Sequence, residues 1–241
     1  MDEKVRGIVV QSLRYGDTSL IVRVFTRNRG LQSYLVKGAF NRNAKNRVAL
    51  FQSLNIIRYV EVGKPKPSTL AYLKDVQLDF VYQSLPNVVN KSAIMIFVSE
   101  LLSKTLTGQE RNEPLYDFIE HSLQWLDLME EGFANFPVFF ALELSRHLGF
   151  YPKTNYVEGS CFDMMEGSFV PDYPVHPYCF GPDEAQLFSR MLDVGIDEAC
   201  RVPLNVVRRR ELLDGIMTFM RLHAPVMTGF RSHEVLKSVL E

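Results

Sequence analysis

The chain has 241 residues, of which 46% are hydrophobic and 23% are charged, and its formal net charge is −1. These values are typical of a globular protein with one large or two small domains, and they exclude a fibrous or broadly disordered chain. The apolar runs are too short for a membrane-spanning helix, and the start MDEKVRGIVV is acidic where a signal peptide is basic, so a cytoplasmic protein is expected. The three cysteines, an odd number, are poor material for a disulfide framework.

The first eighty residues predict five β-strands separated by turns. Alternating or β-rich runs cover residues 5–10, 19–26, 31–36, 50–62 and 69–78. Asn28-Arg29-Gly30 predicts a hairpin turn, because glycine supplies the positive φ that a chain reversal needs. A single open sheet of this length would leave an edge to protect, so these strands favour a small closed barrel over residues 1–80.

After Val81 the apolar period changes from two to between three and four, which predicts helices. These helices are expected over about residues 88–106, 114–129, 137–148, 204–222 and 233–240, with a further one starting at Pro182. Residues 150–181 lose this period and predict a β-hairpin that pairs residues 161–163 with 168–170. The second domain, residues 81–241, is therefore expected to be mainly helical with an irregular insert at about 150–181.

The charge is distributed unevenly. Residues 1–80 hold fourteen Lys/Arg and six Asp/Glu, whereas residues 81–241 hold thirteen and twenty-two. This asymmetry favours a polyanion-binding module joined to an acidic one, although small β domains can also carry excess cations by chance. Phe40 lies in the acid-free stretch 37–47 and is expected to have a surface or half-exposed position, whereas Tyr34 is expected in the core. The cations at turns, loops and strand ends are Arg14, Arg23, Arg27, Arg29, Lys37, Arg42, Lys45, Arg47, Lys64 and Lys66.

Motifs of the common enzyme classes are absent: no phosphate-binding P-loop, dinucleotide fingerprint, nucleophile elbow or H-E-x-x-H is found. Cys161, His176 and Cys179 offer three zinc ligands at most, so neither a metal nor another cofactor is expected. A nuclease metal site at Asp163, Glu166 and Asp172 is an alternative, but acids in a polar loop more often face solvent.

The run Arg208–Arg210 lies in an expected helix, where successive side chains point about 100° apart. At most two of these arginines can face one ligand. Ion pairs with Glu211 or Asp214 on a solvated helix face are therefore the preferred interpretation.

Several short motifs occur in a familiar order. They are Tyr15-Gly16-Asp17-Thr18-Ser19, then Thr26, Gly30 and Lys37-Gly38-Ala39. This succession resembles the start of the bacterial DNA repair protein RecO family, whose members are recombination mediators. Leu148-Gly149-Phe150-Tyr151-Pro152 is similar to the Leu-Gly-x-x-Pro that ends a central helix in that family. Each motif alone is weak, but their order over nearly the whole chain is specific.

The resemblance implies an N-terminal OB fold, a helical C-terminal domain and a non-enzymatic function at the nucleoid. It implies binding of single- and double-stranded DNA, annealing of complementary strands, and loading of RecA onto strands coated by single-stranded DNA-binding protein. The implied partners are RecR and the acidic C-terminal tail of the coating protein. Many members carry a four-cysteine zinc site after Leu-Gly-x-x-Pro, but this chain has Lys-Thr-Asn-Tyr-Val-Glu at residues 153–158, so its insert is expected to lack metal.

These observations assign residues to two surfaces. The DNA backbone is expected to bind Lys37, Arg42, Lys45 and Arg47, on a path extended by Arg14, Arg27, Arg29, Lys64, Lys66 and Phe40. Weaker candidates for the acidic tail are Arg146, Arg208 and Arg209. Replacing Arg42, Lys45 and Arg47 with alanine is expected to remove up to about three phosphate contacts. An RNA- or ribosome-binding OB protein is the alternative, because the same cations and aromatics serve RNA.

Overall fold

The computed structural model describes residues 4–41, 47–63, 70–108, 110–227 and 229–239. The chain folds into two compact units, and each unit takes two separate segments. The barrel unit comprises Met1–Gln83 and Leu106–Gln124, and the helical unit comprises Ser84–Thr105 and Trp125–Glu241. Among the helices described, none is long and apolar enough to cross a bilayer.

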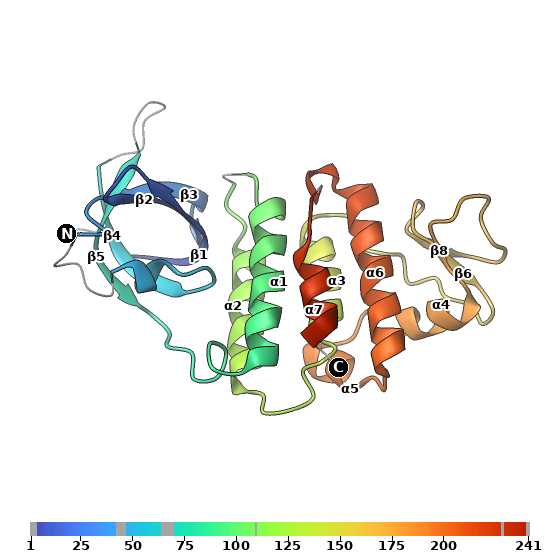
Figure 1. Cartoon of the computed structure of the whole chain (residues 1–241). Coiled ribbons are helices and arrows are strands. Elements are labelled where there is room, and N and C mark those ends of the chain that lie inside the picture. The colour runs from blue at the N-terminus through green and yellow to red at the C-terminus, as the bar shows by residue number, and fades with distance from the viewer. Residues whose placement is uncertain (1–3, 42–46, 64–69, 109, 228, 240–241) are drawn as a thin grey trace. The chain divides into compact units, whose positions relative to one another are not determined.

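Five strands close into a barrel in the order β1-β2-β3-β5-β4 (Figure 1). β3 and β5 run parallel through the pairs Tyr34–Ala71 and Leu35–Tyr72, and the other neighbours are antiparallel. The predicted five-stranded barrel, followed by a mainly helical region, is thus confirmed. The strands are β1 (Lys4–Tyr15), β2 (Ser19–Thr26), β3 (Gly30–Val36), β4 (Ile56–Val62) and β5 (Ala71–Leu78), with the short helix η1 (Val48–Phe51) before β4.

The barrel core follows from the period of two in the strands. In β2, Leu20, Val22 and Val24 are buried, whereas Ile21 between them is only partly buried. Tyr34 is 1% exposed, which confirms that it packs inside. The Tyr34 hydroxyl accepts a hydrogen bond from Tyr59 at 2.9 Å and donates one to Glu61 at 3.0 Å, so the polar tips inside the barrel are paired.

Helix α2 (Glu113–Leu128) begins in the barrel unit and ends in the helical unit. Its first half packs on the outside of the barrel, where the ring of Tyr116 lies 6.0 Å from the ring of Phe25. Phe25 is 3% exposed although its neighbour Val24 points into the core, because Tyr116 covers it. Arg6 of β1 forms an ion pair with Glu120 of α2, which holds the helix in place.

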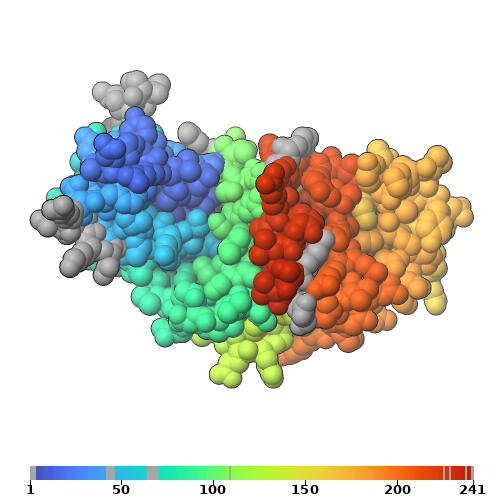
Figure 2. Space-filling view, in the orientation of Figure 1, coloured from blue at the N-terminus to red at the C-terminus, as the bar shows by residue number. Residues whose placement is uncertain are grey.

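The helical unit is built around α1, which packs against α3 and α7, while α3 packs against α5 and α6 (Figure 1). α7 forms part of the surface of this unit (red in Figure 2). The helices are α1 (Val89–Thr105), α3 (Phe136–His147), α4 (Pro182–Ser189), α5 (Ile196–Arg201), α6 (Val206–His223) and α7 (Ser232–Val239), with the short helix η2 (Pro225–Met227) after α6.

A buried polar network ties the start of the helical unit to the end of α2. Oδ1 of Asp127 accepts hydrogen bonds from the backbone N–H groups of Ser84 (2.8 Å) and Leu85 (2.9 Å). Nζ of Lys91 donates to Oγ of Ser84 at 2.7 Å and to the carbonyl oxygens of Asp127 and Met129. Lys91 is only 2% exposed, so its charge depends on these oxygens.

The insert contains a three-stranded sheet of order β7-β6-β8, with β6 (Cys161–Asp163), β7 (Ser168–Val170) and β8 (Cys179–Phe180). The predicted hairpin of β6 and β7 is confirmed. The insert lies against α6, where a Cβ added at Gly215 would come within 2.0 Å of the Phe180 ring. Only glycine therefore allows the ring to approach this helix so closely.

Glu100 of α1 caps the start of α7. Its Oε2 accepts hydrogen bonds from the backbone N–H groups of Ser232 (2.7 Å) and Arg231 (3.1 Å). Partial burial opposes the ionisation of Glu100, but the bonds from Ser232 and Arg231 outweigh it and hold the pKa of Glu100 below its ordinary value of about 4.5. The ionised carboxylate therefore stabilises the folded chain.

This cap predicts a stability difference that depends on pH. Because the folded pKa of Glu100 is lowered, its contribution is fully present above about pH 4.5 and is lost as the pH falls through the folded pKa. Replacing Glu100 with glutamine is expected to cost about 0.5–2 kcal/mol at pH 7, as for other helix caps. Thermal unfolding at pH 3 to 7 should show the two proteins converge in acid; a constant difference would contradict the assignment.

Candidate nucleic-acid interface

One end of the barrel brings cations and aromatic rings together. The turn between β1 and β2 meets the loop after β3 there, because the backbone N–H of Phe40 donates to the carbonyl of Thr18 at 3.2 Å. Gly16 and Gly38, with φ of 60° and 66°, allow both turns to reverse within a few residues. We name this group the turn face; its members are Arg14, Lys37, Phe40, Arg47 and Tyr72.

Each cation of the turn face contacts a ring or a carbonyl group. The guanidinium of Arg14 lies 5.0 Å from the ring centre of Phe40, and Nζ of Lys37 lies 4.6 Å from that of Tyr72. Nη1 of Arg47 donates to the carbonyl of Lys37 at 3.3 Å. Within the described ranges no carboxylate pairs with any of these three cations. Their charges therefore stay available to a ligand, as phosphate binding requires.

The rings of the turn face are accessible as well. Phe40 is 40% exposed, as expected from the sequence, and Tyr72 is 39% exposed. Tyr15, next to Arg14 at the end of β1, is 57% exposed. Exposed rings beside cations form a surface on which bases of a single strand can stack without regard to sequence.

The other end of the barrel is cationic too, but its arginines are neutralised. Nε and Nη2 of Arg27 donate to the two carboxylate oxygens of Asp117 at 2.8 and 2.9 Å. Nη2 of Arg29 lies 2.8 Å from Glu61. Arg27 lowers the pKa of Asp117, chiefly through the hydrogen bonds between them. Arg14 lies beside the start of β2, whereas Arg27 and Arg29 follow its last residue. A strand of this length separates Arg14 from these two arginines by on the order of 20 Å.

The remaining predicted cations of this unit fall into two groups. Arg42, Lys45, Lys64 and Lys66 lie outside the described residues. Arg23 is partly buried, and its guanidinium donates to the carbonyl of Leu106 at 2.9 Å and to the side chain of Gln11 at 3.4 Å. Arg23 therefore holds the segment that returns to the barrel and is not presented to a ligand.

Three arginines of the helical unit are the weaker candidates for binding the acidic tail, and two of them form ion pairs with carboxylates. Arg146 contacts Asp193 at 2.7 Å and Glu143 at 3.2 Å. Arg208 contacts Glu184 at 2.6 Å and Glu211 at 3.2 Å, which confirms the expected pairing with Glu211.

Arg209 differs from these two arginines because it pairs with no carboxylate in the described part of the chain. Its Nε donates to the side-chain oxygen of Asn135 at 2.9 Å and its Nη2 to the carbonyl of Leu204 at 3.0 Å. Burial lowers the pKa of Arg209. With Phe133 it lines a hollow of about 240 Å³, whose other lining residues are Asn90, Glu130, Glu131, Gly132 and Ala134.

Asp163 has a structural role in the insert. Oδ1 of Asp163 accepts hydrogen bonds from the backbone N–H groups of Met165 (2.8 Å) and Glu166 (3.1 Å), which fixes the β6–β7 turn. Nε2 of His176 lies 3.2 Å from Asp163. Cys161, His176 and Cys179 form no convergent ligand set in the described ranges. The rings of Phe162 and Phe169 pack 5.0 Å apart within the insert, and Phe162 also packs on Phe188 of α4 at 4.6 Å.

Sequence reasoning missed Tyr72. The residue lies between buried Ala71 and Leu73, and this alternation alone indicates that its side chain faces outward. Its contact with Lys37 depends on the parallel pairing of β3 with β5, which joins residues far apart in the sequence. No local pattern reports that pairing.

A closed five-stranded barrel with an exposed cationic and aromatic face, joined to a helical unit, defines a two-part protein of the OB-fold class. Sequence comparison gives the family. Residues 1–79 match the family described as "Recombination protein O N terminal", and residues 87–228 match "Recombination protein O C terminal". The chain belongs to the RecO family of DNA repair proteins, which confirms the resemblance seen in its motifs.

Full-length relatives agree with this assignment. Proteins described as DNA repair protein RecO from Phocaeicola vulgatus, Flavobacterium johnsoniae and Flavobacterium psychrophilum are 33%, 34% and 35% identical to the chain. Each match covers 240 residues, which is 99% of this chain and 99% of the relative. Family membership thus supports a role in DNA repair and identifies the barrel as an OB fold.

Proposed function

We propose that this chain is a non-enzymatic recombination mediator of DNA repair. It binds single- and double-stranded DNA, anneals complementary strands, and helps to load RecA onto strands coated by single-stranded DNA-binding protein. The observation that carries the proposal is the turn face: three cations without a carboxylate partner in the described ranges, beside exposed rings, on the OB barrel of a DNA repair family.

The chemistry of the turn face suits binding without sequence preference. Arg14, Lys37 and Arg47 would neutralise phosphates and release the counterions condensed on the strand. Phe40 and Tyr72, which are 40% and 39% exposed, offer rings on which bases can stack. Arg42, Lys45, Lys64 and Lys66 are proposed to extend this path. Arg27 and Arg29 are not part of this path, because carboxylates already pair with them.

Annealing needs no catalytic group under this proposal. Two single strands repel each other through their phosphates, and a cationic surface that binds both lowers that repulsion while base pairing supplies the free energy. The barrel therefore acts as a shared counterion, and the proposal implies that the protein associates with the nucleoid.

A strand-annealing assay tests the function directly. Complementary oligonucleotides are coated with single-stranded DNA-binding protein, and duplex formation is followed by fluorescence quenching with and without the chain. We expect the chain to accelerate annealing of the coated strands. Absence of acceleration at every protein ratio would contradict the proposal.

Two further measurements separate the alternatives. Tighter binding of an RNA strand than of the matching DNA strand would favour the RNA-binding alternative. Cleavage of DNA in Mg²⁺ or Mn²⁺ that is lost on Asp163→Ala would favour a nuclease, although Asp163 is held by the β6–β7 turn.

The acidic tail of the coating protein is the proposed ligand of the helical unit, and RecR is proposed as a further partner on family membership alone. A tail of this kind needs a cation that is not already ion-paired, together with an apolar wall. In the described chain Arg209 and Phe133 combine the two in one hollow. Arg146 and Arg208 are weaker candidates because carboxylates occupy them.

We expect Arg209→Gln to weaken binding of the tail peptide by roughly tenfold, the cost of one charge-assisted hydrogen bond. Arg208→Gln is the matched control, because it removes the adjacent cation whose charge Glu184 already neutralises. Fluorescence anisotropy with a labelled peptide of the acidic tail measures both variants. Equal losses in the two would remove the hollow from the proposed contact.

A further inference from the structure

A second cluster of cations lies at the end of the barrel opposite the turn face, and each of its arginines is paired with a carboxylate. The N-terminal part of β1 and the β2–β3 hairpin enclose a hollow of about 340 Å³. We name it the guanidinium hollow. Its lining residues are Lys4, Val5, Arg6, Arg27, Asn28 and Arg29.

The arginine side chains around the guanidinium hollow are more exposed than the carboxylates that pair with two of them. The side chains of Arg6, Arg27 and Arg29 are 43%, 47% and 42% exposed. The carboxylates that pair with Arg6 and Arg29 are far less exposed, at 7% for Glu120 and 12% for Glu61. An anion that approaches from solvent therefore meets the guanidinium groups before it meets these acids.

Several donors of the guanidinium hollow are not engaged by the part of the chain described here. Lys4 forms no ion pair within that part, and Arg29 contacts Glu61 through Nη2, which leaves its Nε and Nη1. Arg6 uses Nε for Asp79 and Nη2 for Glu120, which leaves Nη1. Phosphate oxygens accept several hydrogen bonds at once, and fixed guanidinium donors suit them.

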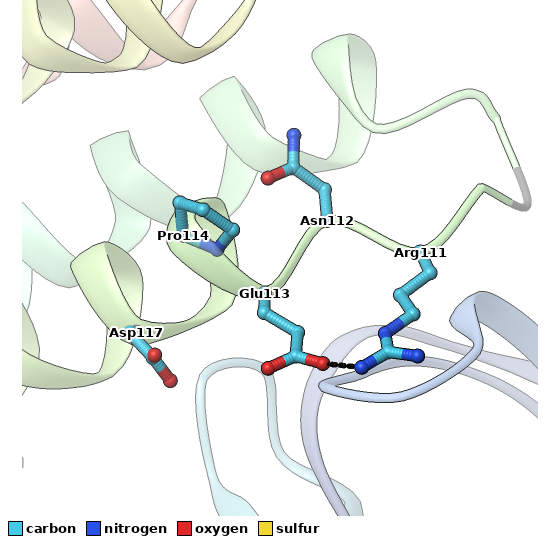
Figure 3. Close-up of a pocket in the computed structure, with 5 residues that line it drawn as sticks. All are labelled: Arg111, Asn112, Glu113, Pro114 and Asp117. Carbon is cyan, nitrogen blue, oxygen red and sulfur yellow. Dashed lines mark hydrogen bonds and ion pairs between the residues drawn. The ribbon is translucent and has the colours of Figure 1, made fainter.

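The carboxylates of α2 compete for the same cations. Figure 3 shows Glu113 and Asp117 extending from the first turns of α2 toward the same side, away from Asn112 and Pro114. Asp117 holds Nε and Nη2 of Arg27, and Glu113, which also pairs with Arg111 (Figure 3), lies 3.3 Å from Nη1 of Arg27. All three guanidinium nitrogens of Arg27 are thus held by this acidic pair, and a phosphate must displace a carboxylate to reach them.

We propose that the guanidinium hollow is a second phosphate-binding site of the barrel, and that Glu113 and Asp117 screen it and hold its affinity down. The inference rests on the proposed function in one respect, which is that the phosphate belongs to nucleic acid. The site takes either an internal phosphodiester or a terminal phosphate of a strand. Because the hollow and the turn face lie on the order of 20 Å apart along β2, one barrel contacts phosphates at two separate places.

The test starts from a variant in which the turn face is removed by Arg14→Gln, Lys37→Gln and Arg47→Gln. In this background we expect Lys4→Gln with Arg27→Gln to weaken binding of a short single-stranded oligonucleotide by about threefold to tenfold. Glu113→Gln with Asp117→Asn should tighten it by a similar factor, because the screen is gone. Arg208→Gln, which removes a paired arginine of the helical unit, and Glu158→Gln, an exposed acid of the same unit, should change binding less than twofold.

Two probes identify the source of the phosphate. If a 5′-phosphorylated oligonucleotide binds more tightly than its 5′-hydroxyl counterpart and the hollow variants abolish the difference, the site takes a terminal phosphate. Equal affinities that both fall in the hollow variants assign it to the internal backbone. In the same background, calorimetric titration with inorganic tripolyphosphate measures binding to the hollow without bases. This binding should weaken with Lys4→Gln and weaken further with Lys4→Gln plus Arg27→Gln.

The proposal is overturned if the hollow variants weaken binding no more than Arg208→Gln does, or if removal of the two acids fails to tighten binding. Lys4→Gln guards against a folding artefact, because Lys4 is exposed and forms no ion pair in the described ranges. A separate comparison tests the proposed function. If the turn face does not bind DNA, the turn-face variant will bind DNA as tightly as the unaltered chain.

Discussion

Replacing Arg14, Lys37 and Arg47 together with glutamine is expected to weaken binding of single-stranded DNA by roughly ten- to a hundredfold at low salt. Three lost phosphate contacts should also flatten the slope of log affinity against log salt by about 2. The loss should be similar for every base sequence, because phosphate contacts carry no sequence information. Fluorescence anisotropy over a salt series measures both quantities.

The prediction is sharp because these three cations support little of the fold. None forms an ion pair in the described ranges, so glutamine leaves no buried carboxylate without a partner. A control of equal charge replaces Arg58, Arg146 and Arg208, each paired with a carboxylate away from the turn face. If both triple variants lose affinity equally, net charge and not the turn face determines binding.

Asp127→Ala is expected to lower the free energy of unfolding by about 3–5 kcal/mol, the cost of breaking a buried charged network from one side. The substitution leaves the N–H groups of Ser84 and Leu85 without their acceptor. It also removes the carboxylate near Lys91. Burial lowers the pKa of Lys91, and the charge of Asp127 partly offsets this effect. Urea unfolding measures the change as a shift of the midpoint.

A double-mutant cycle separates the parts of this network. Asp127→Asn keeps an acceptor for the two N–H groups and should cost less than half as much as Asp127→Ala. Lys91→Met combined with Asp127→Ala should cost less than the sum of the single changes, because the two residues share one network. A loss below about 1 kcal/mol for Asp127→Ala would show that water replaces the carboxylate.

Local patterns predicted the elements of the barrel well. Leu20, Val22 and Val24 alternate in β2, and alternation is a short-range consequence of strand geometry. The ion pair of Arg208 with Glu211 was equally accessible, since side chains three apart meet on a helix.

Availability of a cation could not be predicted in the same way. Arg27 and Arg29 occupy a hairpin turn that looks as free as the loop with Lys37, yet the structure pairs them with Asp117 and Glu61. These partners lie 90 and 32 positions further along the chain. The number of basic residues therefore predicted which domain is cationic. It did not predict which of these cations lack a carboxylate partner, because the partners are distant in the sequence.

The return of Leu106–Gln124 to the barrel has a consequence for synthesis. The last barrel strand ends at Leu78, but Tyr116, which covers Phe25, is added 38 residues later. At bacterial or slower elongation rates this delay lasts roughly two to eight seconds. A nascent chain thus carries a closed set of strands with an uncovered aromatic patch, and a fragment that ends near residue 80 would keep that patch exposed for its whole lifetime.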